Sequence, residues 1–272
     1  MATEKGALVV VALLALSVGW WWQPSRCDDT QQTVTIGSTV IHGLRTAVGH
    51  THVHKYLGIR YAQPPTGLRR FQRSVLAELP QEVDATRYGA YCPQLPLSNT
   101  GMSEDCLFLN VFTPHLPSDR RVPVFVWLHG GGFIVGSSDL YEGDVLAAEG
   151  QIVVVTLNYR LGALGFLATG DNSSVGNYGL WDQHVALQWV HKYIGYFGGD
   201  ERRITLGGVS AGAASASIHS LSPLSRDLFR SVVQLSGSAS SPWARVSVDD
   251  ALKAARVGGS LVSVFCPSLS LE

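Results

Sequence analysis

The stretch Ile204–Ala216, with the sequence ITLGGVSAGAASA, decides the fold. The apolar run Ile204–Leu206 is typical of a buried strand, and the small residues after Ser210 are typical of a closely packed helix. Gly208 and Gly212 flank Ser210 and permit a sharp strand-to-helix turn, which would raise the serine Oγ above the end of a sheet. The stretch therefore predicts an exposed serine hydroxyl in the position of a nucleophile.

A second glycine-rich segment, His129–Phe133 with the sequence HGGGF, follows the apolar run Val122–Leu128. Loops of this kind can direct backbone N–H groups at an oxyanion, so the chain carries both a candidate nucleophile and candidate oxyanion donors. We interpret His129 as shaping this loop rather than as taking protons. Phe133 is either an acyl-pocket residue or a structural one.

Apolar runs of buried-strand type alternate with helical sequence along the chain. These runs are Val122–Leu128, Ile152–Leu157, Ile204–Val209 and Val232–Leu235. Between the second and third, residues 179–197 carry apolar side chains every third or fourth position, which predicts a helix with one apolar face. The β-branched residues of 33–57 predict short antiparallel strands at the start of the sheet.

This order predicts an α/β fold with a mostly parallel, doubly wound sheet that begins with antiparallel strands. Ligands of such sheets bind at the carboxyl ends of the strands, where both Ser210 and the glycine loop fall. The helix aromatics Trp181, Trp189, Tyr193 and Phe197 have core spacing and are expected to pack rather than to bind a cofactor.

Composition excludes several classes of function. Of the 272 residues, 46% are hydrophobic and 15% are charged, which indicates a globular protein with a substantial core rather than a disordered chain. The formal net charge is −1 and no long run of like charges occurs, so the electrostatic footprint of nucleic-acid or anionic-membrane binding is missing. We expect a neutral small molecule as the partner.

Residues 1–26 differ from the rest of the chain. Lys5 precedes an apolar run, Gly6–Trp22, which is followed by polar residues, and this order predicts a secretory signal peptide. The alternative is an uncleaved anchor helix, although a spanning helix usually needs about 20 residues and this run has 17. In either case the chain from Cys27 onward would face an oxidising compartment, and membrane contact would follow only from an uncleaved segment.

Cysteines and a sequon fit that compartment. Cys92 and Cys106 flank a polar, turn-rich segment and form either a disulfide or a pair of free buried thiols. Cys27 and Cys266 have no evident partners. Asn172 begins the sequon Asn-Ser-Ser, and its glycine and aspartate neighbours predict an exposed loop that could carry a glycan.

Several motifs together identify a family resemblance. Two long segments resemble its signatures, Phe197–Gly212 and Glu104–Val111, and shorter similar segments are Tyr56–Ile59, Tyr61–Pro65, Asn158–Gly162 and Gly176–Gln183. The chain resembles the type-B carboxylesterases, the esterase and lipase branch of the α/β-hydrolases that includes the cholinesterases. The likeness runs from about Thr33 to about Arg256.

The resemblance implies an α/β-hydrolase fold and hydrolysis of carboxylic esters through an acyl-enzyme that water releases. Ser210 would be the nucleophile, and the N–H groups of Gly131, Gly132 and Ala211 would form the oxyanion hole. Ser236 matches a family position that supports the catalytic triad of serine, acid and histidine without itself being a member of the triad. No cofactor and no metal are implied, and the substrate would be a small neutral ester.

The resemblance also assigns structural roles. Cys92 and Cys106 match the first family disulfide. Two pairs match buried ion pairs that hold loops near the active-site gorge, Arg70 with Glu104 and Arg160 with Asp182.

Two departures from the family pattern concern the chemistry and the substrate. The residue before the nucleophile is usually glutamate and is Val209 here, which removes a carboxylate that would help to stabilise a charged imidazole and predicts reduced rather than abolished chemistry. The segment between Cys92 and Cys106 holds no tryptophan, so a cationic choline substrate is disfavoured.

A third departure concerns the catalytic base. In this fold the triad follows the order serine, acid, histidine, yet His219 is the last histidine of the sequence. His219 lies two to three helical turns from the Ser210 hydroxyl and cannot serve it, because a helix advances about 1.5 Å per residue. We expect 27–257 to be the N-terminal part of a carboxylesterase domain and 258–272 a divergent tail. The resemblance therefore leaves open whether this chain turns over an ester by itself or is a non-catalytic binding or adhesion protein.

The remaining histidines carry weaker signals. His50, His52 and His54 alternate, so on a strand they would share one face and could hold a transition metal, but a solvated face is the favoured interpretation because no acidic ligand is arranged nearby. His184 and His191 are expected on the polar side of their helix. The sequence predicts no metal site and makes no prediction of oligomeric state.

Overall fold

The computed structural model describes residues 30–94, 101–114, 120–171, 173–247, 249–253 and 256. The predicted signal peptide, the sequon asparagine Asn172, the cysteines Cys27 and Cys266 and the tail 258–272 lie outside the described residues.

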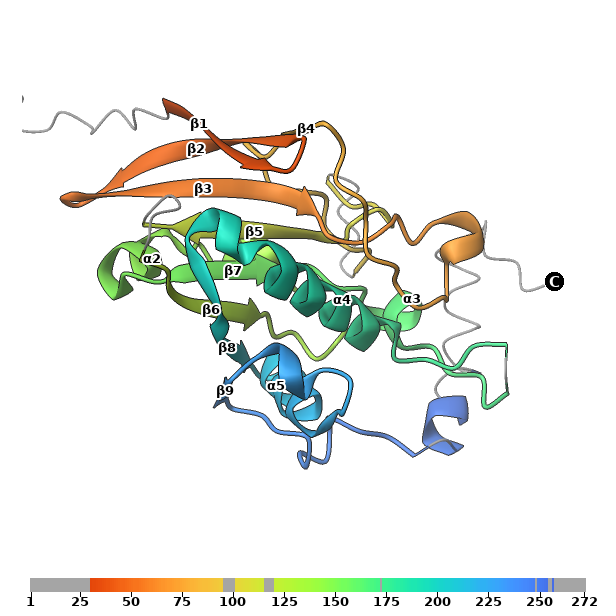
Figure 1. Cartoon of the computed structure of the whole chain (residues 1–272). Coiled ribbons are helices and arrows are strands. Elements are labelled where there is room, and N and C mark those ends of the chain that lie inside the picture. The colour runs from red at the N-terminus through yellow and green to blue at the C-terminus, as the bar shows by residue number, and fades with distance from the viewer. Residues whose placement is uncertain are drawn as a thin grey trace, which may run out of the picture.

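One mixed sheet organises the described part of the chain (Figure 1). Its strands are β1 (Thr30–Ile36), β2 (Thr39–Val48), β3 (Thr51–Arg60), β4 (Glu82–Asp84), β5 (Phe108–Thr113), β6 (Val122–Leu128), β7 (Val153–Leu157), β8 (Gly199–Val209) and β9 (Ser231–Leu235). The strand order is β1-β2-β3-β5-β7-β6-β8-β9, with β4 beside β2. From β1 to β7 neighbouring strands of this path are antiparallel, and from β7 to β9 they are parallel.

Helices connect the strands and cover both faces of the sheet. They are α2 (Asp144–Gly150), α3 (Gly162–Phe166), α4 (Tyr178–Tyr193) and α5 (Ala211–Leu221), with the short 3₁₀ turns η1 (Gly67–Arg69), η2 (Ser138–Leu140), η3 (Ile194–Phe197) and η4 (Arg226–Leu228). The helix predicted over residues 179–197 is observed as α4 followed by η3. The parallel half and the helices on both faces agree with the predicted α/β-hydrolase fold.

Strand β5 was not identified from the sequence. It lies in the middle of the sheet and pairs antiparallel with β3 on one side and with β7 on the other. The antiparallel part of the sheet therefore extends further along the strand order than the predicted strands of 33–57.

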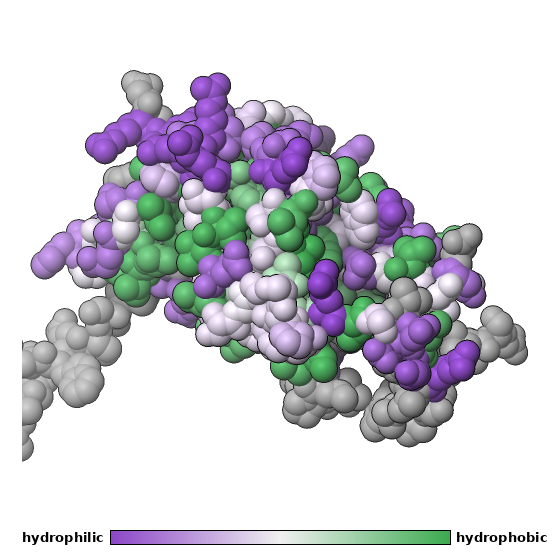
Figure 2. All heavy atoms as spheres, turned by 90° about the horizontal axis from the view of Figure 1, so that it is seen from below, coloured by the Kyte–Doolittle hydropathy of each residue, from purple (hydrophilic) through white to green (hydrophobic). Residues whose placement is uncertain are grey.

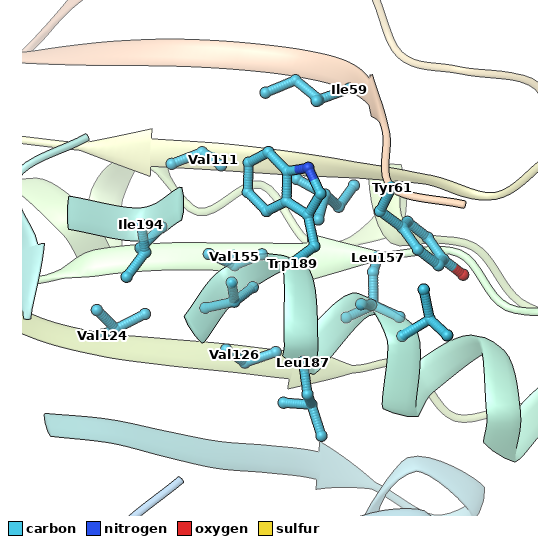
Figure 3. Packing of buried hydrophobic residues seen from close by; sticks show 14 of the residues in the cluster. Ile59, Tyr61, Val111, Val124, Val126, Val155, Leu157, Leu187, Trp189 and Ile194 are labelled. Atoms are coloured by element: carbon cyan, nitrogen blue, oxygen red, sulfur yellow. The ribbon is translucent and has the colours of Figure 1, made fainter. Parts of the chain in front are cut away.

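The main core lies between the sheet and α4. Trp189 of α4 is fully buried over the strands, and Figure 3 shows its indole beside Val111 and above Val155. Phe197 of η3 continues this layer and meets Tyr56 edge-on, with ring centroids 5.0 Å apart. The predicted packing role of Trp189 and Phe197 is thus observed.

The opposite face of the sheet is covered by α2. Val155 of β7 lies in the core between the sheet and α4, whereas Val154 packs on the other face against Ala147 and Ala148 of α2. Side chains of a strand alternate between faces, so a continuous apolar run such as Val153–Leu157 is what a sheet covered on both sides requires.

The prediction that Val232–Leu235 is a buried strand is wrong for the described structure. Most of β9 is exposed, including Val233 at 39% and Leu235 at 48%, and within the described residues no strand pairs with its outer edge. Figure 2 shows hydrophobic side chains gathered on the face that carries β9 and α5. Exposed large apolar side chains on or near these elements include Leu221, Leu224, Val233, Leu235 and Trp243.

No helix within the described ranges combines the length and the apolar character needed to cross a membrane. The run Gly6–Trp22, on which the anchor alternative depends, falls outside those ranges.

Candidate active site

Ser210 occupies a sharp turn between β8 and α5. Its backbone has φ 54° and ψ −118°, a combination that residues other than glycine rarely adopt. The turn is fixed on both sides, because the Ser210 N–H donates to the Leu235 carbonyl at 2.8 Å and the Ser210 carbonyl accepts from the Ala214 N–H at 3.0 Å. Such backbone strain costs of the order of 1–3 kcal/mol and clusters at functional sites.

The flanking glycines are required by close packing. A Cβ on Gly208 would overlap the Gly212 carbonyl group, and a Cβ on Gly212 would overlap the Leu128 carbonyl oxygen and lie 2.7 Å from that of His129. The start of α5 thus lies directly against the end of β6. The G-x-S-x-G pattern in this chain therefore has a steric cause.

The glycine loop begins beside the serine. A Cβ on Gly130 would lie 3.3 Å from the Ser210 Cβ and 2.9 Å from the Val209 carbonyl oxygen. Gly131 has φ 114° and packs against the Val135 carbonyl, while its own carbonyl accepts from the Ile134 and Val135 N–H groups at 3.0 Å each. The structure thus brings the two predicted parts of the site together at the carboxyl ends of β6 and β8.

Gly132 and Phe133 form the outer part of the loop. Gly132 has φ 63° and is exposed, with no atom within 4 Å of a Cβ placed on it. Phe133 also has a positive φ, its ring packs against Phe166 with centroids 4.9 Å apart, and its carbonyl accepts from the Gly162 N–H at 2.7 Å. The loop is therefore tied to α3 and open to solvent at Gly132.

His129 is a buried, neutral support of the loop. Burial lowers the pKa of His129 to about 4, so the ring is neutral at pH 7. Its Nδ1 lies 2.8 Å from the Gly130 carbonyl oxygen, which can only accept, so the ring proton is on Nδ1. The ring stacks on Tyr159 at 4.3 Å, and the Tyr159 hydroxyl donates to the His129 carbonyl at 2.9 Å. This arrangement fits the interpretation that His129 shapes the loop.

Three side-chain amides that hold the loop and its surroundings were missed by sequence reasoning. Asn158 Oδ1 accepts from the Ser138 N–H at 2.8 Å, and Asn110 Nδ2 donates to the Ser138 hydroxyl at 3.0 Å. Gln94 exchanges two hydrogen bonds with the backbone of Gly136. Asn110 and Asn158 lie inside the quoted family motifs, so their positions were available, but nothing local in the sequence indicated their partners.

The predicted cross-links are present. Cys92 and Cys106 form a disulfide. Arg160 and Asp182 form a fully buried pair, with Arg160 Nη2 at 2.8 Å from Asp182 Oδ1, and the Arg160 N–H also donates to this carboxylate at 2.9 Å. Ser74 adds a further hydrogen bond to Asp182.

The second predicted ion pair is less buried than expected. Arg70 donates to Glu104 through two nitrogens at 2.7 Å each, but both side chains stay about a quarter exposed, at 29% and 26%. Water screens the attraction between charges that stay partly exposed. The Arg70–Glu104 pair therefore contributes less than the buried Arg160–Asp182 pair to the rigidity of the site.

Ser236 lies directly after β9 with φ 60° and is exposed. The neighbouring Gly237 packs so closely on Ser210 that a Cβ there would overlap the Ser210 carbonyl oxygen. The segment that contains Ser236 therefore contacts the backbone of Ser210, and its supporting role in catalysis remains a prediction.

His219 is a structural residue of α5. Its ring is buried, with Nε2 at 3.0 Å from Gln183 Oε1 and Nδ1 at 3.0 Å from Ser225 Oγ. Burial, assisted by the nearby His184, lowers the pKa of His219 to about 3. Both ring nitrogens are thus engaged away from Ser210.

The expectation that His184 lies on the polar side of its helix is wrong. His184 is buried where η4 packs on α4, and its Nδ1 lies 2.9 Å from the Ser225 hydroxyl. His191, on the same helix, is exposed as expected. Of the alternating N-terminal histidines, His52 is exposed on β3. Across the described ranges, no group of three histidine, cysteine, aspartate or glutamate side chains is arranged to hold a metal ion.

Comparison with known proteins gives the family. The model of the carboxylesterase family matches residues 30–264. The chain belongs to the carboxylesterase family. It is 43% identical over 240 residues to an acetylcholinesterase of Danio rerio, and the aligned region covers 82% of this chain and 38% of that relative. It is 45% identical over 205 residues to the pyrethroid hydrolase Ces2a of Mus musculus, and the aligned region covers 70% of this chain and 37% of that relative. This carboxylesterase-family chain thus spans less than two fifths of the length of either relative.

Proposed function

We propose that this chain carries the nucleophile and the oxyanion donors of a carboxylic-ester hydrolase. The observation that carries the proposal is the strained backbone of Ser210, held at the carboxyl end of β8 against a loop of three consecutive glycines. Family membership supports it, because one relative is by name an acetylcholinesterase and another a pyrethroid hydrolase.

In the proposed reaction the Ser210 Oγ attacks the ester carbonyl carbon and loses its proton to a base. The carbonyl oxygen becomes an oxyanion that accepts hydrogen bonds from the N–H groups of Gly131, Gly132 and Ala211. Collapse of this tetrahedral intermediate expels the alcohol, which takes up a proton, and leaves an ester between the acyl group and Ser210. Water then adds to this ester and releases the acid.

The base is not supplied by the two buried histidines near these elements. His129 is a poor base, because its ring is buried and burial lowers its pKa to about 4. His219 has both ring nitrogens engaged, one by Gln183 and the other by Ser225. Without a base, the oxyanion donors and the binding site alone give about 10³–10⁴-fold catalysis over water. We therefore expect weak turnover wherever Ser210 acts without a histidine partner.

The substrate that we propose is a small neutral ester. The side chain before the nucleophile is Val209, so the immediate neighbour of Ser210 is apolar rather than a carboxylate that would attract a cation. A secreted protein is also proposed, because the Cys92–Cys106 disulfide is typical of oxidising compartments. A glycan on Asn172 remains a prediction.

Covalent labelling tests the proposal. The 272-residue chain is treated with a fluorophosphonate probe, and the modified residue is mapped by mass spectrometry. We expect a single adduct on Ser210 that Ser210→Ala abolishes and that Ser231→Ala, a change at an exposed serine of β9, preserves. Absence of the adduct in folded protein would refute the hydrolase and support a non-catalytic binding protein of the same family.

A further inference from the structure

The side chain of Gln94 makes two hydrogen bonds to the backbone of one residue, Gly136, at the far end of the glycine loop; we call this pair of hydrogen bonds the Gln94 grip. The Gln94 Oε1 accepts from the Gly136 N–H at 2.8 Å, and the Gln94 Nε2 donates to the Gly136 carbonyl at 2.9 Å. The same Nε2 lies 3.1 Å from the Cys92 carbonyl oxygen. A primary amide is one of few side chains that can both donate to and accept from one backbone residue, so this contact depends on the residue type.

Gly136 connects this grip to the site. It has φ 123°, and a Cβ on it would overlap the His129 ring and lie 2.5 Å from the Gly130 carbonyl oxygen. Gly130 in turn contacts Ser210. Movement of Gly136 toward His129 or Gly130 would therefore push against those residues, because no free space separates them.

The grip itself rests on a rigid base. The disulfide to Cys106 fixes Cys92, two residues before Gln94. On the other side, the Tyr91 hydroxyl donates to Asp139 at 2.6 Å, so the same segment holds the chain after Gly136 at a second point. The end of the glycine loop is thus fastened to the disulfide-closed segment rather than to its own strand alone.

We propose that Gln94 is a positioning residue, which sets the direction of the loop's N–H groups by holding Gly136 against His129 and Gly130. The proposal rests on the proposed function in its statement that these N–H groups receive an oxyanion. The mechanical part, that Gln94 restrains the loop, is independent of any chemistry.

Hydrogen exchange of the full 272-residue chain tests the restraint. Gln94→Met keeps the length of the side chain but removes its hydrogen bonds, and Gln188→Met makes the same change at an exposed position of α4. We expect the amides of residues 130–136 to exchange about 10- to 100-fold faster in Gln94→Met, as the loss of two hydrogen bonds implies, with no change in Gln188→Met. Equal exchange in the two variants would overturn the proposal.

A second variant separates positioning from general loss of stability. Gln94→Glu retains only acceptors when ionised, whereas its protonated form again offers a donor. We expect the exchange rate of residues 130–136, taken relative to wild type, to fall back toward one as the pH is lowered through the carboxyl titration near 4. A ratio that stays constant with pH, or faster exchange over the whole chain, would show that the residue only contributes stability.

Probe labelling then links the restraint to the site. If wild type forms the Ser210 adduct, Gln94→Met should form it at least 10-fold more slowly, and an unchanged rate would overturn the positioning role. If wild type forms no adduct, the proposed function fails, and the exchange measurement alone decides whether Gln94 restrains the loop.

Discussion

Mild acid should destabilise this protein strongly, because two histidines are buried as neutral rings. Burial lowers the pKa of His129 to about 4 and that of His219 to about 3, whereas in the unfolded chain both should titrate near 6.5. As the pH falls below about 6.5, the unfolded state takes up protons that the folded state does not. The stability that these rings contribute is complete above that pH and is lost as the pH falls toward the folded-state pKa values.

The size of the effect follows from the width of that window. Each ring removes about 1.4 kcal/mol of unfolding free energy per pH unit once the unfolded state is protonated. At pH 5 the loss is about 2 kcal/mol for each ring and about 4 kcal/mol for both. That loss is a large part of the unfolding free energy of a typical domain, which is roughly 5–15 kcal/mol. His184, whose pKa is also lowered by burial, acts in the same direction.

Urea unfolding followed by tryptophan fluorescence between pH 8 and pH 5 measures the loss. The free energy of unfolding should fall with a slope approaching two to three protons per molecule below pH 6. His219→Gln should reduce this slope by about one proton, and His191→Gln, at an exposed position of α4, should leave it unchanged. A free energy that stays constant from pH 7 to pH 5, or a slope that His219→Gln does not alter, would refute the reasoning.

Three further predictions concern the loop, the buried ion pair and the sheet edge. Gly131→Ala should slow labelling of Ser210 by about 100-fold, because the new Cβ would overlap the Val135 carbonyl and turn an oxyanion donor away. Gly132→Ala meets no neighbouring atom and is strained only by its positive φ, so it should slow labelling much less, and equal rates in the two variants would contradict the assignment. Asp182→Ala should lower the free energy of urea unfolding by about 3–5 kcal/mol, since it leaves a buried guanidinium unpaired, and a loss below 1 kcal/mol would show that water compensates it. The exposed edge strand β9 should make the chain self-associate in sedimentation velocity, and Val233→Lys should reduce that association, because a charge there opposes edge-to-edge pairing. Association that Val233→Lys leaves unchanged would exclude β9 as the contact.

The turn at Ser210 could be predicted from the sequence because its cause is local. Gly208 and Gly212 are spaced so that strand, turn and helix approach one another within a few residues, and a side chain at either position would overlap the backbone. The same holds for strand β7, whose continuous apolar run reflects cover on both faces. Where a structural feature is caused by residues close together in the sequence, the sequence pattern can predict that feature.

The exposure of β9 and the position of β5 could not be predicted in this way. An apolar run records that a strand suits a buried place, but not which neighbours it has, so Val232–Leu235 has the same pattern whether or not another strand pairs with its outer edge. The central position of β5 depends on pairing with β3 and β7, which lie far from it in sequence. Register and strand order are non-local properties, and periodicity does not encode them.

The same distinction limits what the glycine loop itself can determine. Glycines at 130–132 permit positive φ and close packing, but they equally permit many other conformations, because glycine loses the most conformational freedom on folding. What selects one conformation is the set of polar contacts that reach the loop from 30 to 42 residues away, namely Gln94 on Gly136 and Tyr159 on His129. A glycine-rich motif is therefore necessary for the proposed oxyanion hole but not sufficient for it. A chain that kept HGGGF and lost these distant partners should keep the motif and lose the geometry.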